Sequence, residues 1–296
     1  LPKLKNFYQV SFNNIEELET ADIFIQSNQF GQKLRKLNKY YNYILESKKP
    51  FIVVESATFR RNAPSFPSKN AYHRFSWFSY FRDQGYYNNV DRPSNRWNLI
   101  QQEQNIKIKD WKTTGDYVLL LLQRPNDSSL INLVQEHGTY ENFLIFVIKK
   151  IRENTDRPIL IRPHPNRVDW QLTAIDKADI RGVQISKNLP RNANILNGGE
   201  GLYEDFKNAK VAIGFNSNSL TESVCEGVPT FSLSPSSMAW EVSNHNLSDI
   251  ETPKLFDRSQ WLNNLGYTQW KHNEIIKGKP YYHLMEIYDE IKDLRK

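Results

Sequence analysis

The chain has 296 residues, of which 39% are hydrophobic and 13% are aromatic. This composition supports packed cores and excludes a wholly disordered chain, and the length suits two domains of roughly 130 to 150 residues each. The net charge of +6 at pH 7 favours anionic partners: nucleotide phosphates, acidic glycans, nucleic acid or an anionic membrane surface that the protein contacts peripherally.

A single cysteine, Cys225, excludes an internal disulfide and a zinc site built from cysteines. It lies in an apolar stretch, which indicates a buried structural thiol and fits a reducing compartment. No apolar run reaches the roughly 20 residues that a transmembrane helix needs, and no signal peptide is visible. We therefore expect no transmembrane segment and a cytoplasmic location.

The N-terminal part alternates between strand and helix patterns. Ala21–Gln26 is a short apolar strand pattern, Gly31–Ser47 has apolar residues at spacings of three and four, and Phe51–Val54 is rich in β-branched residues. This order of strand, helix and strand predicts a parallel sheet, with its functional residues at the carboxyl ends of the strands.

Residues 63–111 show no clear periodicity. Many aromatic side chains occur here, including Trp77, Phe78, Tyr80, Phe81, Tyr86, Tyr87 and Trp97. A long irregular stretch inside a compact domain is usually a functional or covering loop. Two interpretations stay open: the rings form a small core beneath an extended loop, or they form an aromatic wall that faces the substrate.

A second α/β pattern begins after a predicted hinge at residues 111–115. It opens with the strand Tyr117–Leu122 and the helix Tyr140–Asn154, whose predicted apolar face includes Phe146. Further strands and helices are expected at residues 157–162, 183–186, 202–208, 211–213, 220–226 and 230–233.

These patterns predict an α/β protein of two Rossmann-like domains that face each other across a cleft. The predicted N-terminal domain, with its long aromatic loop, covers residues 1–112. The predicted C-terminal domain covers residues 113–278. Residues 279–296 form a predicted helix that packs back across the domains.

Two strand-end loops predict a phosphate site in the second domain. The tetrad Arg162-Pro163-His164-Pro165 follows one strand pattern, and the polar loop Gly214–Ser219 precedes a later helix. Cationic side chains, hydroxyl groups and helix N-terminal amides all favour a bound anion. The candidate phosphate ligands are Arg162, His164, Asn216, Ser217 and Ser219. The alternative for the tetrad is a proline-rich turn with a surface histidine.

Three further side chains are candidates for the same site. Gln123 and Ser128 follow another strand, although Ser128 or Ser129 serves equally well as a helix cap. Glu222, one turn into the later helix, is placed to accept hydrogen bonds from a ribose or to act as a helix N-terminal charge.

Several stretches of the chain occur in the order known from one enzyme family. They are Val54–Arg60, Gly85–Tyr87 with Arg92–Ser94, Leu122–Ser129, Arg162–Pro165, Asn216–Glu222, Glu226–Pro229 and Ala239–Trp240. Together they resemble the capsule-type β-Kdo transferases, the family of bacterial capsular polysaccharide synthesis and modification proteins. Two Rossmann-like domains facing across a cleft are also the architecture of GT-B glycosyltransferases.

The resemblance implies a glycosyltransferase whose C-terminal domain binds a nucleotide sugar and whose N-terminal domain binds the acceptor. It implies a donor linked to CMP, CDP or UDP, a glycan acceptor of the capsule or surface polysaccharide type, no other cofactor and no bound catalytic metal. The sequence departs from the family at its acidic pair, which reads Glu55-Ser56 here, so the expected catalytic aspartate is absent.

A sugar transfer needs a base for the acceptor hydroxyl and a group that stabilises the leaving phosphate. We assign Glu55 as the catalytic base and His164 as the general acid or phosphate donor. Asp83 and Asp91 are alternative acids, and a surface role for Glu55 beside Arg60 or Arg61 also stays open.

Two other functions remain open. One is a phage-type enzyme that glycosylates modified DNA bases, suggested by the basic charge and by Arg74, Trp77, Arg82, Arg92, Arg96 and Trp97. The other is a protein that binds nucleotide sugars without catalysis, which the missing aspartate allows. The other histidines show no metal-like pairing, and there is no Asp-x-Asp motif or Gly-Lys-Ser/Thr phosphate loop.

Overall fold

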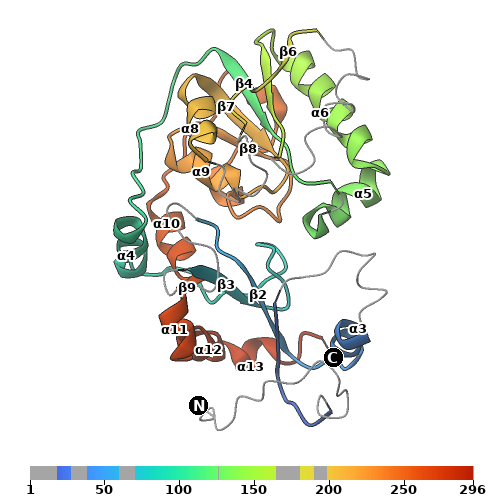
Figure 1. Cartoon of the computed structure of the whole chain (residues 1–296), viewed down its shortest axis with the longest axis vertical. Helices are drawn as coiled ribbons and strands as arrows, with labels where there is room; N and C mark the ends of the chain where they lie inside the picture. Colours follow the sequence, from blue (N-terminus) through green and yellow to red (C-terminus); the bar gives the residue numbers. More distant parts are fainter. Residues whose placement is uncertain are drawn as a thin grey trace.

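The structure is a computed structural model that describes residues 19–27, 39–59, 71–125, 127–164, 181–189 and 199–295. The strands in these ranges form two sheets, with the orders β1-β2-β3-β9 and β6-β5-β4-β7-β8. The sheets belong to two units stacked along the long axis of the molecule, with the five-stranded sheet in the upper unit (Figure 1). The architecture is therefore mixed α/β.

The upper sheet is parallel throughout its described pairings. Its strands are β4 (Tyr117–Leu121), β5 (Ile159–Arg162), β6 (Val183–Ile185), β7 (Ala209–Gly214) and β8 (Thr230–Ser232). Counted along the chain, the order across this sheet is third, second, first, fourth and fifth, which is the order of a Rossmann fold. The prediction of a Rossmann-like C-terminal unit is confirmed.

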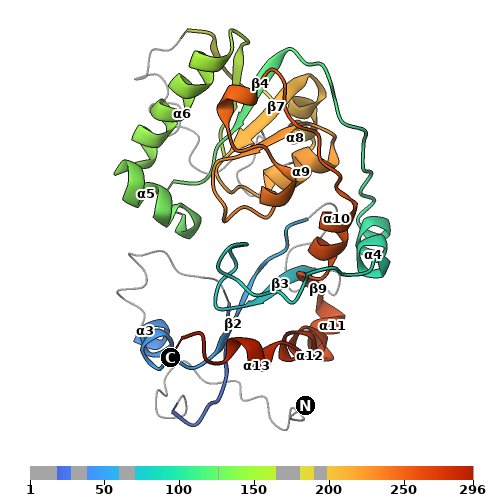
Figure 2. The same cartoon turned by 180° about the vertical axis from the view of Figure 1, so that it is seen from behind.

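Helices cover both faces of the upper sheet. The even-numbered residues of β4 pack with α6 (Tyr140–Asn154), whereas its odd-numbered residues share a cluster with α8 (Gly199–Lys207) and α9 (Ser219–Cys225). Figure 2 shows α6 and α8 on opposite sides of the sheet. Because both faces are covered, the strand reads as an uninterrupted apolar run.

Helix α6 has the predicted bounds and begins at a capping residue that the prediction did not use. Thr139 accepts a hydrogen bond from the Asn142 amide at 3.0 Å, which satisfies one of the free N–H groups of the first turn. The expectation that Phe146 lies on the buried face is wrong, because Phe146 is 46% exposed. The buried stripe runs through Phe143, Val147 and Ile151 at spacings of four. Helix α5 (Ile131–His137) precedes α6 and was not predicted.

The lower sheet is mixed. Strands β1 (Phe24–Ser27) and β2 (Phe51–Ser56) are parallel, and α3 (Lys39–Glu46) lies between them in the chain. Strand β3 (Tyr72–Trp77) is antiparallel to β2, and β9 (Gln269–Lys271) is antiparallel to β3. The prediction of a parallel pair is right for β1 and β2, but the prediction of a second Rossmann-like sheet is wrong for the described strands.

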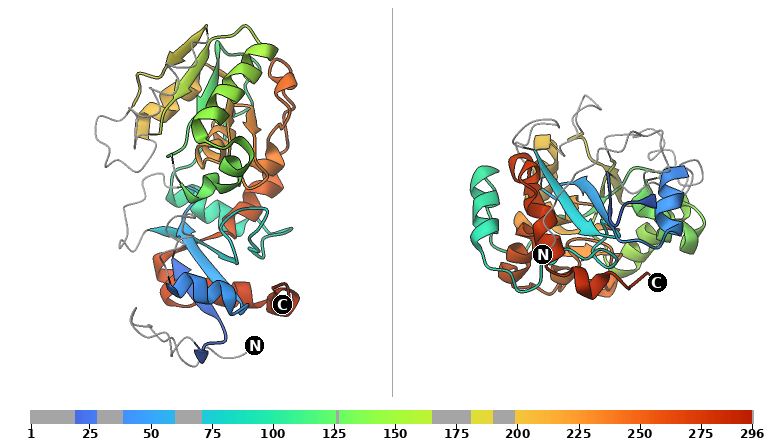
Figure 3. Two further views of the ribbon diagram at one scale, coloured as in Figure 1. Left: turned by 90° about the vertical axis from the view of Figure 1, so that its right-hand side faces the viewer. Right: turned by 90° about the horizontal axis from the view of Figure 1, so that it is seen from below.

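The C-terminal part of the chain returns to the lower unit. It contains α10 (Ser259–Gly266), β9, α11 (His272–Ile276), α12 (Lys279–Met285) and α13 (Tyr288–Ile291). Residues 269–271 therefore pair within the first sheet, although the predicted C-terminal domain extended to residue 278. The last predicted helix is divided into α12 and α13, which lie against the lower sheet (Figure 3). The Trp77 indole donates to the Leu284 carbonyl at 3.0 Å.

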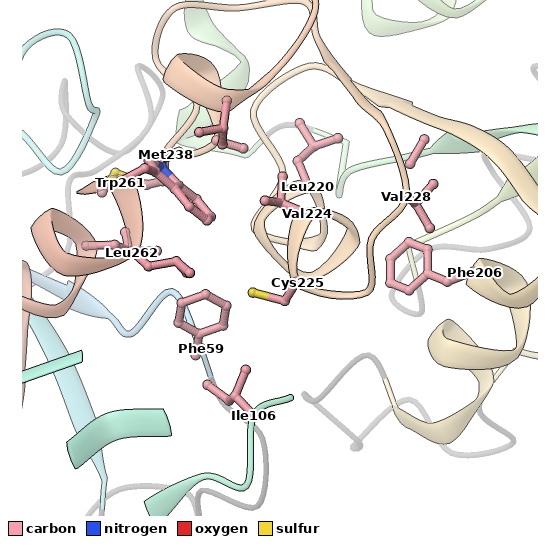
Figure 4. Packing of buried hydrophobic residues seen from close by; sticks show 14 of the residues in the cluster. Phe59, Ile106, Phe206, Leu220, Val224, Cys225, Val228, Met238, Trp261 and Leu262 are labelled. Carbon is pink, nitrogen blue, oxygen red and sulfur yellow. Dashed lines mark hydrogen bonds between the residues drawn. The ribbon is translucent and has the colours of Figure 1, made fainter. Parts of the chain in front are cut away.

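A continuous apolar cluster joins the two units. Phe59 and Ile106 lie close to Cys225, with Leu262 and Trp261 on the adjoining side (Figure 4). Cys225 is fully buried in this cluster, as predicted. Helices α4 (Asn95–Glu103) and α10 lie against each other beside this junction (Figures 1 and 2).

The predicted hinge at residues 111–115 is packed against the upper unit. The Trp111 indole donates to the Phe256 carbonyl at 2.9 Å, and the Arg258 guanidinium lies 4.2 Å from the Trp111 ring centroid. The Lys112 amide donates to the Gly227 carbonyl at 2.7 Å. This segment is therefore a packed connection rather than an exposed linker.

The aromatic stretch supports the small-core interpretation. Five of its rings are buried: Trp77, Tyr80, Phe81, Tyr87 and Trp97. Tyr86 is 43% exposed. The stretch also contains β3 and α4, which the prediction missed because β3 carries His, Arg and Ser among its apolar residues.

None of the helices in the described part of the chain has the length and hydropathy of a membrane span.

Candidate functional site

The candidate site lies at the topological switch point of the upper sheet, where the strand order reverses. Strands β4 and β7 are neighbours in this sheet, but the chain visits β5 and β6 between them. Loops that follow such a pair of strands lead away from each other, which makes this point the usual ligand position in Rossmann-like folds. We call the loops at residues 122–129 and 215–219 the β4–β7 edge.

Gln123 and Asn216 are brought together at the β4–β7 edge, as the prediction requires. The Gln123 side-chain amide donates to Asn216 Oδ1 at 2.7 Å, and Gln123 Oε1 accepts from the Asn216 backbone amide at 3.0 Å. The Asn216 side chain also donates to the Ser129 carbonyl and to the Ser236 hydroxyl, at 2.9 and 2.8 Å. These contacts tie the two loops into one network, so both residues organise the edge.

The predicted hydroxyl groups lie in the same two loops, partly buried. Ser217 Oγ accepts from the Ser219 backbone amide at 3.2 Å, a contact that shapes the turn before α9. The backbone amide of Leu220 donates to the Ser217 carbonyl at 3.0 Å, so this first-turn donor is bonded locally. Ser128 Oγ lies 3.0 Å from the hydroxyl of Tyr80, which belongs to the lower unit.

Glu222 faces α8 rather than open solvent. It is 8% exposed, and the Tyr203 hydroxyl donates to its Oε2 at 3.4 Å. Its predicted contact with a ribose remains a prediction.

Arg162 is buried in an ion pair. Its Nη1 donates to Asp205 Oδ2 at 2.6 Å and to the Asn188 carbonyl at 3.0 Å, and the Arg162 and Asp205 side chains are 6% and 1% exposed. Asp205 also accepts from the Ser186 hydroxyl at 2.7 Å and from the side-chain amide of Asn188 at 2.7 Å. The charge of Arg162 is therefore balanced within the protein, and its contacts join the end of β5 to α8.

His164 lies two residues beyond β5 and is half-buried. Pro165, the last member of the tetrad, lies outside the described residues. Since β5 neighbours β4 in the sheet, His164 follows a strand that ends at the same side as the β4–β7 edge. The predicted phosphate contacts of Arg162 and His164 remain predictions.

Glu55 lies near the end of β2, across from Arg74 on β3. Its Oε1 accepts from the Ser56 backbone amide at 2.7 Å, while the buried Arg74 donates from Nε to the Ser56 carbonyl at 2.9 Å. The alternative acids Asp83 and Asp91 are exposed. The alternative partners of Glu55, Arg60 and Arg61, lie outside the described residues.

Tyr80 extends from the lower unit to the β4–β7 edge, where its hydroxyl lies 3.0 Å from Ser128 Oγ. Burial is the main reason that the pKa of Tyr80 is raised, its hydrogen bond with Ser128 opposes the rise, and the carboxylates of Asp127 and Glu55 add to it. The ring of Tyr80 also lies 5.7 Å from the Arg74 guanidinium.

A second contact between the units lies beside Tyr80. The Arg82 amide donates to the Ser236 carbonyl at 3.2 Å, and the Arg82 guanidinium pairs with Glu241 at 3.0 Å. The sequence analysis did not assign Tyr80, Arg82, Ser236 or Asp205 to the predicted phosphate site. Ser236 had a usable signal, because the serine-rich run after β8 repeats the pattern of small polar residues after an apolar strand.

The side chains that suggested DNA binding are used inside the fold. Trp77 and Trp97 are 0% and 4% exposed. Arg96 pairs with Glu274 at 2.9 Å and stacks on Trp270, with 3.8 Å between the guanidinium and the ring centroid. Within the described ranges, no group of three or more His, Cys, Asp or Glu is placed to hold a metal ion.

Three of the other histidines have local structural contacts. His245 stacks on Trp240 with ring centroids 3.4 Å apart, and His137 packs against Phe143 at 5.2 Å. His283 lies against Tyr267 and the Tyr87 carbonyl, and burial followed by the charge of a nearby arginine lowers its pKa to about 4.

The solved structures that are similar to this chain include two of KpsC from Thermosulfurimonas dismutans. The β-Kdo 2,4 transferase has 10% sequence identity, covers 86% of each chain and has a TM-score of 0.48. The β-Kdo 2,7 transferase has 11% identity, covers 90% of this chain and 99% of that chain, and has a TM-score of 0.48. No protein-family model and no curated protein matches the chain.

Proposed function

We propose that this protein is a glycosyltransferase that moves a sugar from a nucleotide-linked donor to a hydroxyl group of a glycan. The observation that carries the proposal is the β4–β7 edge. Two polar loops meet there at the direction change of a Rossmann-ordered sheet, and a tyrosine from the other unit contacts them.

The donor phosphates lie at the β4–β7 edge in this proposal. Ser128, Ser217 and Ser219 supply neutral hydrogen-bond donors, and His164 supplies a hydrogen bond or a proton to the departing phosphate. Arg162 contributes to the site by its ion pair with Asp205, which fixes the end of β5 and with it the start of the loop that carries His164.

The acceptor is activated from the lower unit. Glu55 takes the proton of the acceptor hydroxyl, whose oxygen then forms a bond to the anomeric carbon of the sugar. The bond from that carbon to the phosphate oxygen breaks, and its electron pair leaves on the phosphate. The contact of Tyr80 with Ser128 and the electrostatic effect of Glu55 on Tyr80 support this role for Glu55.

The finer assignments rest on the motif resemblance. It favours a donor linked to CMP, CDP or UDP, with Glu222 accepting from the ribose, and a capsule or surface polysaccharide as acceptor. A cytoplasmic location and a peripheral membrane contact belong to the same proposal. None of the described contacts favours DNA as the acceptor, because the arginine and tryptophan side chains that suggested DNA have partners within the protein.

The first test is a thermal-shift screen of the protein with CMP, CDP, UDP and GDP and their sugar conjugates. A ligand at 100 times its Kd stabilises the folded state by about 2.7 kcal/mol, which corresponds to a shift of roughly 5 °C or more. We expect one nucleotide family to give this shift. His164→Ala should reduce it, whereas His245→Ala, on an exposed histidine of the same unit, should not. No shift with any nucleotide refutes the proposal.

The second test measures transfer. Glu55→Gln should lower kcat by about 10²- to 10⁴-fold with little change in nucleotide affinity, because a positioned base contributes that much to rate. Asp83→Asn, a change of an exposed acid in the same unit, should leave kcat near the parent value. Nucleotide binding without turnover of any donor would instead identify a binding protein without catalysis.

A further inference from the structure

The loop at residues 78–87, which carries Tyr80, is a rigid part of the lower unit. Its two ends are joined by hydrogen bonds between Trp77 and Tyr86, at 3.0 and 3.2 Å. Gly85 is required by close packing, since a Cβ atom there would lie 2.1 Å from the Ser79 carbonyl oxygen. The loop therefore presents Tyr80 in a fixed position, and Tyr80 is only 8% exposed.

The loop meets the upper unit at two points. Tyr80 reaches Ser128 at one side of the β4–β7 edge, and Arg82 reaches the Ser236 carbonyl at the other. Ser236 itself belongs to the network of Asn216, whose amide donates to the Ser236 hydroxyl at 2.8 Å. The lower unit thus contacts the same polar network that joins the β4 and β7 loops.

The chemistry of the Tyr80–Ser128 pair gives the contact a direction. A phenol and a serine hydroxyl each have one hydrogen, so only one of them can donate in their shared hydrogen bond. Either oxygen can be the donor in the 3.0 Å contact, but a phenol is more acidic than the hydroxyl of serine and is therefore the better donor of the two. When the phenol donates to Ser128, the Ser128 hydrogen is left to donate elsewhere.

We propose that Tyr80 is a positioning residue of the donor site: it donates its hydroxyl hydrogen to Ser128 and leaves the Ser128 hydroxyl to donate to an anionic oxygen of the donor phosphates. This inference rests on the proposed function. It makes the lower unit part of the phosphate site as well as of the acceptor side. It also makes the distance between the two units a condition for tight donor binding.

The test compares Tyr80→Phe, Ser128→Ala and the double variant with the parent chain. Phenylalanine keeps the ring beside Phe81, whose centroid lies 4.4 Å from that of Tyr80, and removes only the hydroxyl. Tyr86→Phe removes the hydroxyl of a 43% exposed tyrosine on the same loop and is the matched control. The probe is the nucleotide that stabilises the parent most, and its Kd is measured by calorimetry for each protein.

We expect Tyr80→Phe and Ser128→Ala each to weaken nucleotide binding by about 3- to 10-fold, the factor of a typical net hydrogen bond. The double variant should bind about as weakly as the weaker of the two single variants, because both changes remove the same interaction. In transfer assays the KM for the donor should rise by the same factor with kcat nearly unchanged. Tyr86→Phe should bind like the parent.

Different outcomes separate this inference from the proposed function. If the parent binds no nucleotide, the proposed function fails and this inference fails with it. If the parent binds and Tyr80→Phe binds equally well, or if the two single losses multiply in the double variant, only the role of Tyr80 is refuted. If Tyr80→Phe melts far below the parent, Ser128→Ala decides, and unchanged binding by that variant overturns the inference.

Discussion

Asp205→Asn should destabilise the upper unit strongly while keeping the size of the side chain. Asp205 and Arg162 are 1% and 6% exposed at the side chain and pair at 2.6 Å. Asparagine removes the charge that balances Arg162, and it replaces one acceptor oxygen by a donor facing the donors of Ser186 and Asn188.

The magnitude follows from the burial of the pair. Removing one partner of a buried ion pair costs about 3 to 5 kcal/mol, because the remaining charge stays uncompensated in a medium of low dielectric constant. The stability of a whole domain is about 5 to 15 kcal/mol, so the variant should fold but lose a large part of its stability. An exposed pair is a suitable control: Lys150 and Glu153 are 45% and 56% exposed, and Glu153→Gln should cost no more than about 0.5 kcal/mol.

The assay is urea unfolding at pH 7, followed by far-ultraviolet circular dichroism, for the parent, Asp205→Asn, Arg162→Met and the double variant. Each single change should lower the free energy of unfolding by about 3 to 5 kcal/mol. The double variant should lose less than the sum by about 0.5 to 3 kcal/mol, since both changes break the same interaction. A loss below about 1 kcal/mol in Asp205→Asn, or strict additivity, would refute the assignment of this ion pair as a major stabilising contact.

Three further predictions concern stability. Since burial lowers the pKa of His283 to about 4, the unfolded chain binds a proton between pH 6.5 and 4 that the folded chain does not. The free energy of unfolding should therefore fall by up to about 3 kcal/mol as the pH drops through this window, and His283→Gln should flatten that dependence in urea titrations. Gly227 has a φ of +72°, and a Cβ atom there would lie 2.0 Å from the Asp110 carbonyl oxygen, so Gly227→Ala should cost about 2 to 5 kcal/mol. Gly138 has a φ of +75°, but a Cβ atom there would meet no atom nearer than Asn142 Nδ2 at 4.0 Å, so Gly138→Ala should cost only about 1 to 2 kcal/mol. Equal losses of unfolding free energy in the two glycine variants would contradict the packing argument. Cys225→Ser places a hydroxyl in the apolar cluster between the units, and burying an unbonded hydroxyl costs about 1 to 3 kcal/mol of stability. Cys225→Ser should therefore lower the melting temperature more than Cys225→Ala does.

The local part of the architecture was predictable. Helix α6 has the bounds read from its apolar spacing, and the ends of β4, β5, β7 and β8 were each expected to within two residues. These elements have strong periodicity or uninterrupted apolar runs, and their order along the chain implied a parallel sheet. The meeting of Gln123 and Asn216 followed from the same rule, because parallel strands present their carboxyl ends at one edge.

The contacts between distant segments were not predictable from one sequence. Strand β9 has three residues and pairs with a strand almost 200 positions earlier, so no local pattern marks its partner. The ion pair of Arg162 with Asp205 likewise depends on how α8 packs beside β5. The same holds for Tyr80, which lies in an aromatic stretch without periodicity.

By itself, the sequence determined the Rossmann-like unit and the residue types at its carboxyl edge, because hydrophobic periodicity and strand-end loops are local properties of a chain. Only the tertiary structure decided which of those polar side chains are engaged within the protein and which neighbour comes from the other unit. The physical reason is that a buried charge or amide takes its nearest partner in space: Arg162 pairs with Asp205, Gln123 with Asn216, and Ser128 with Tyr80.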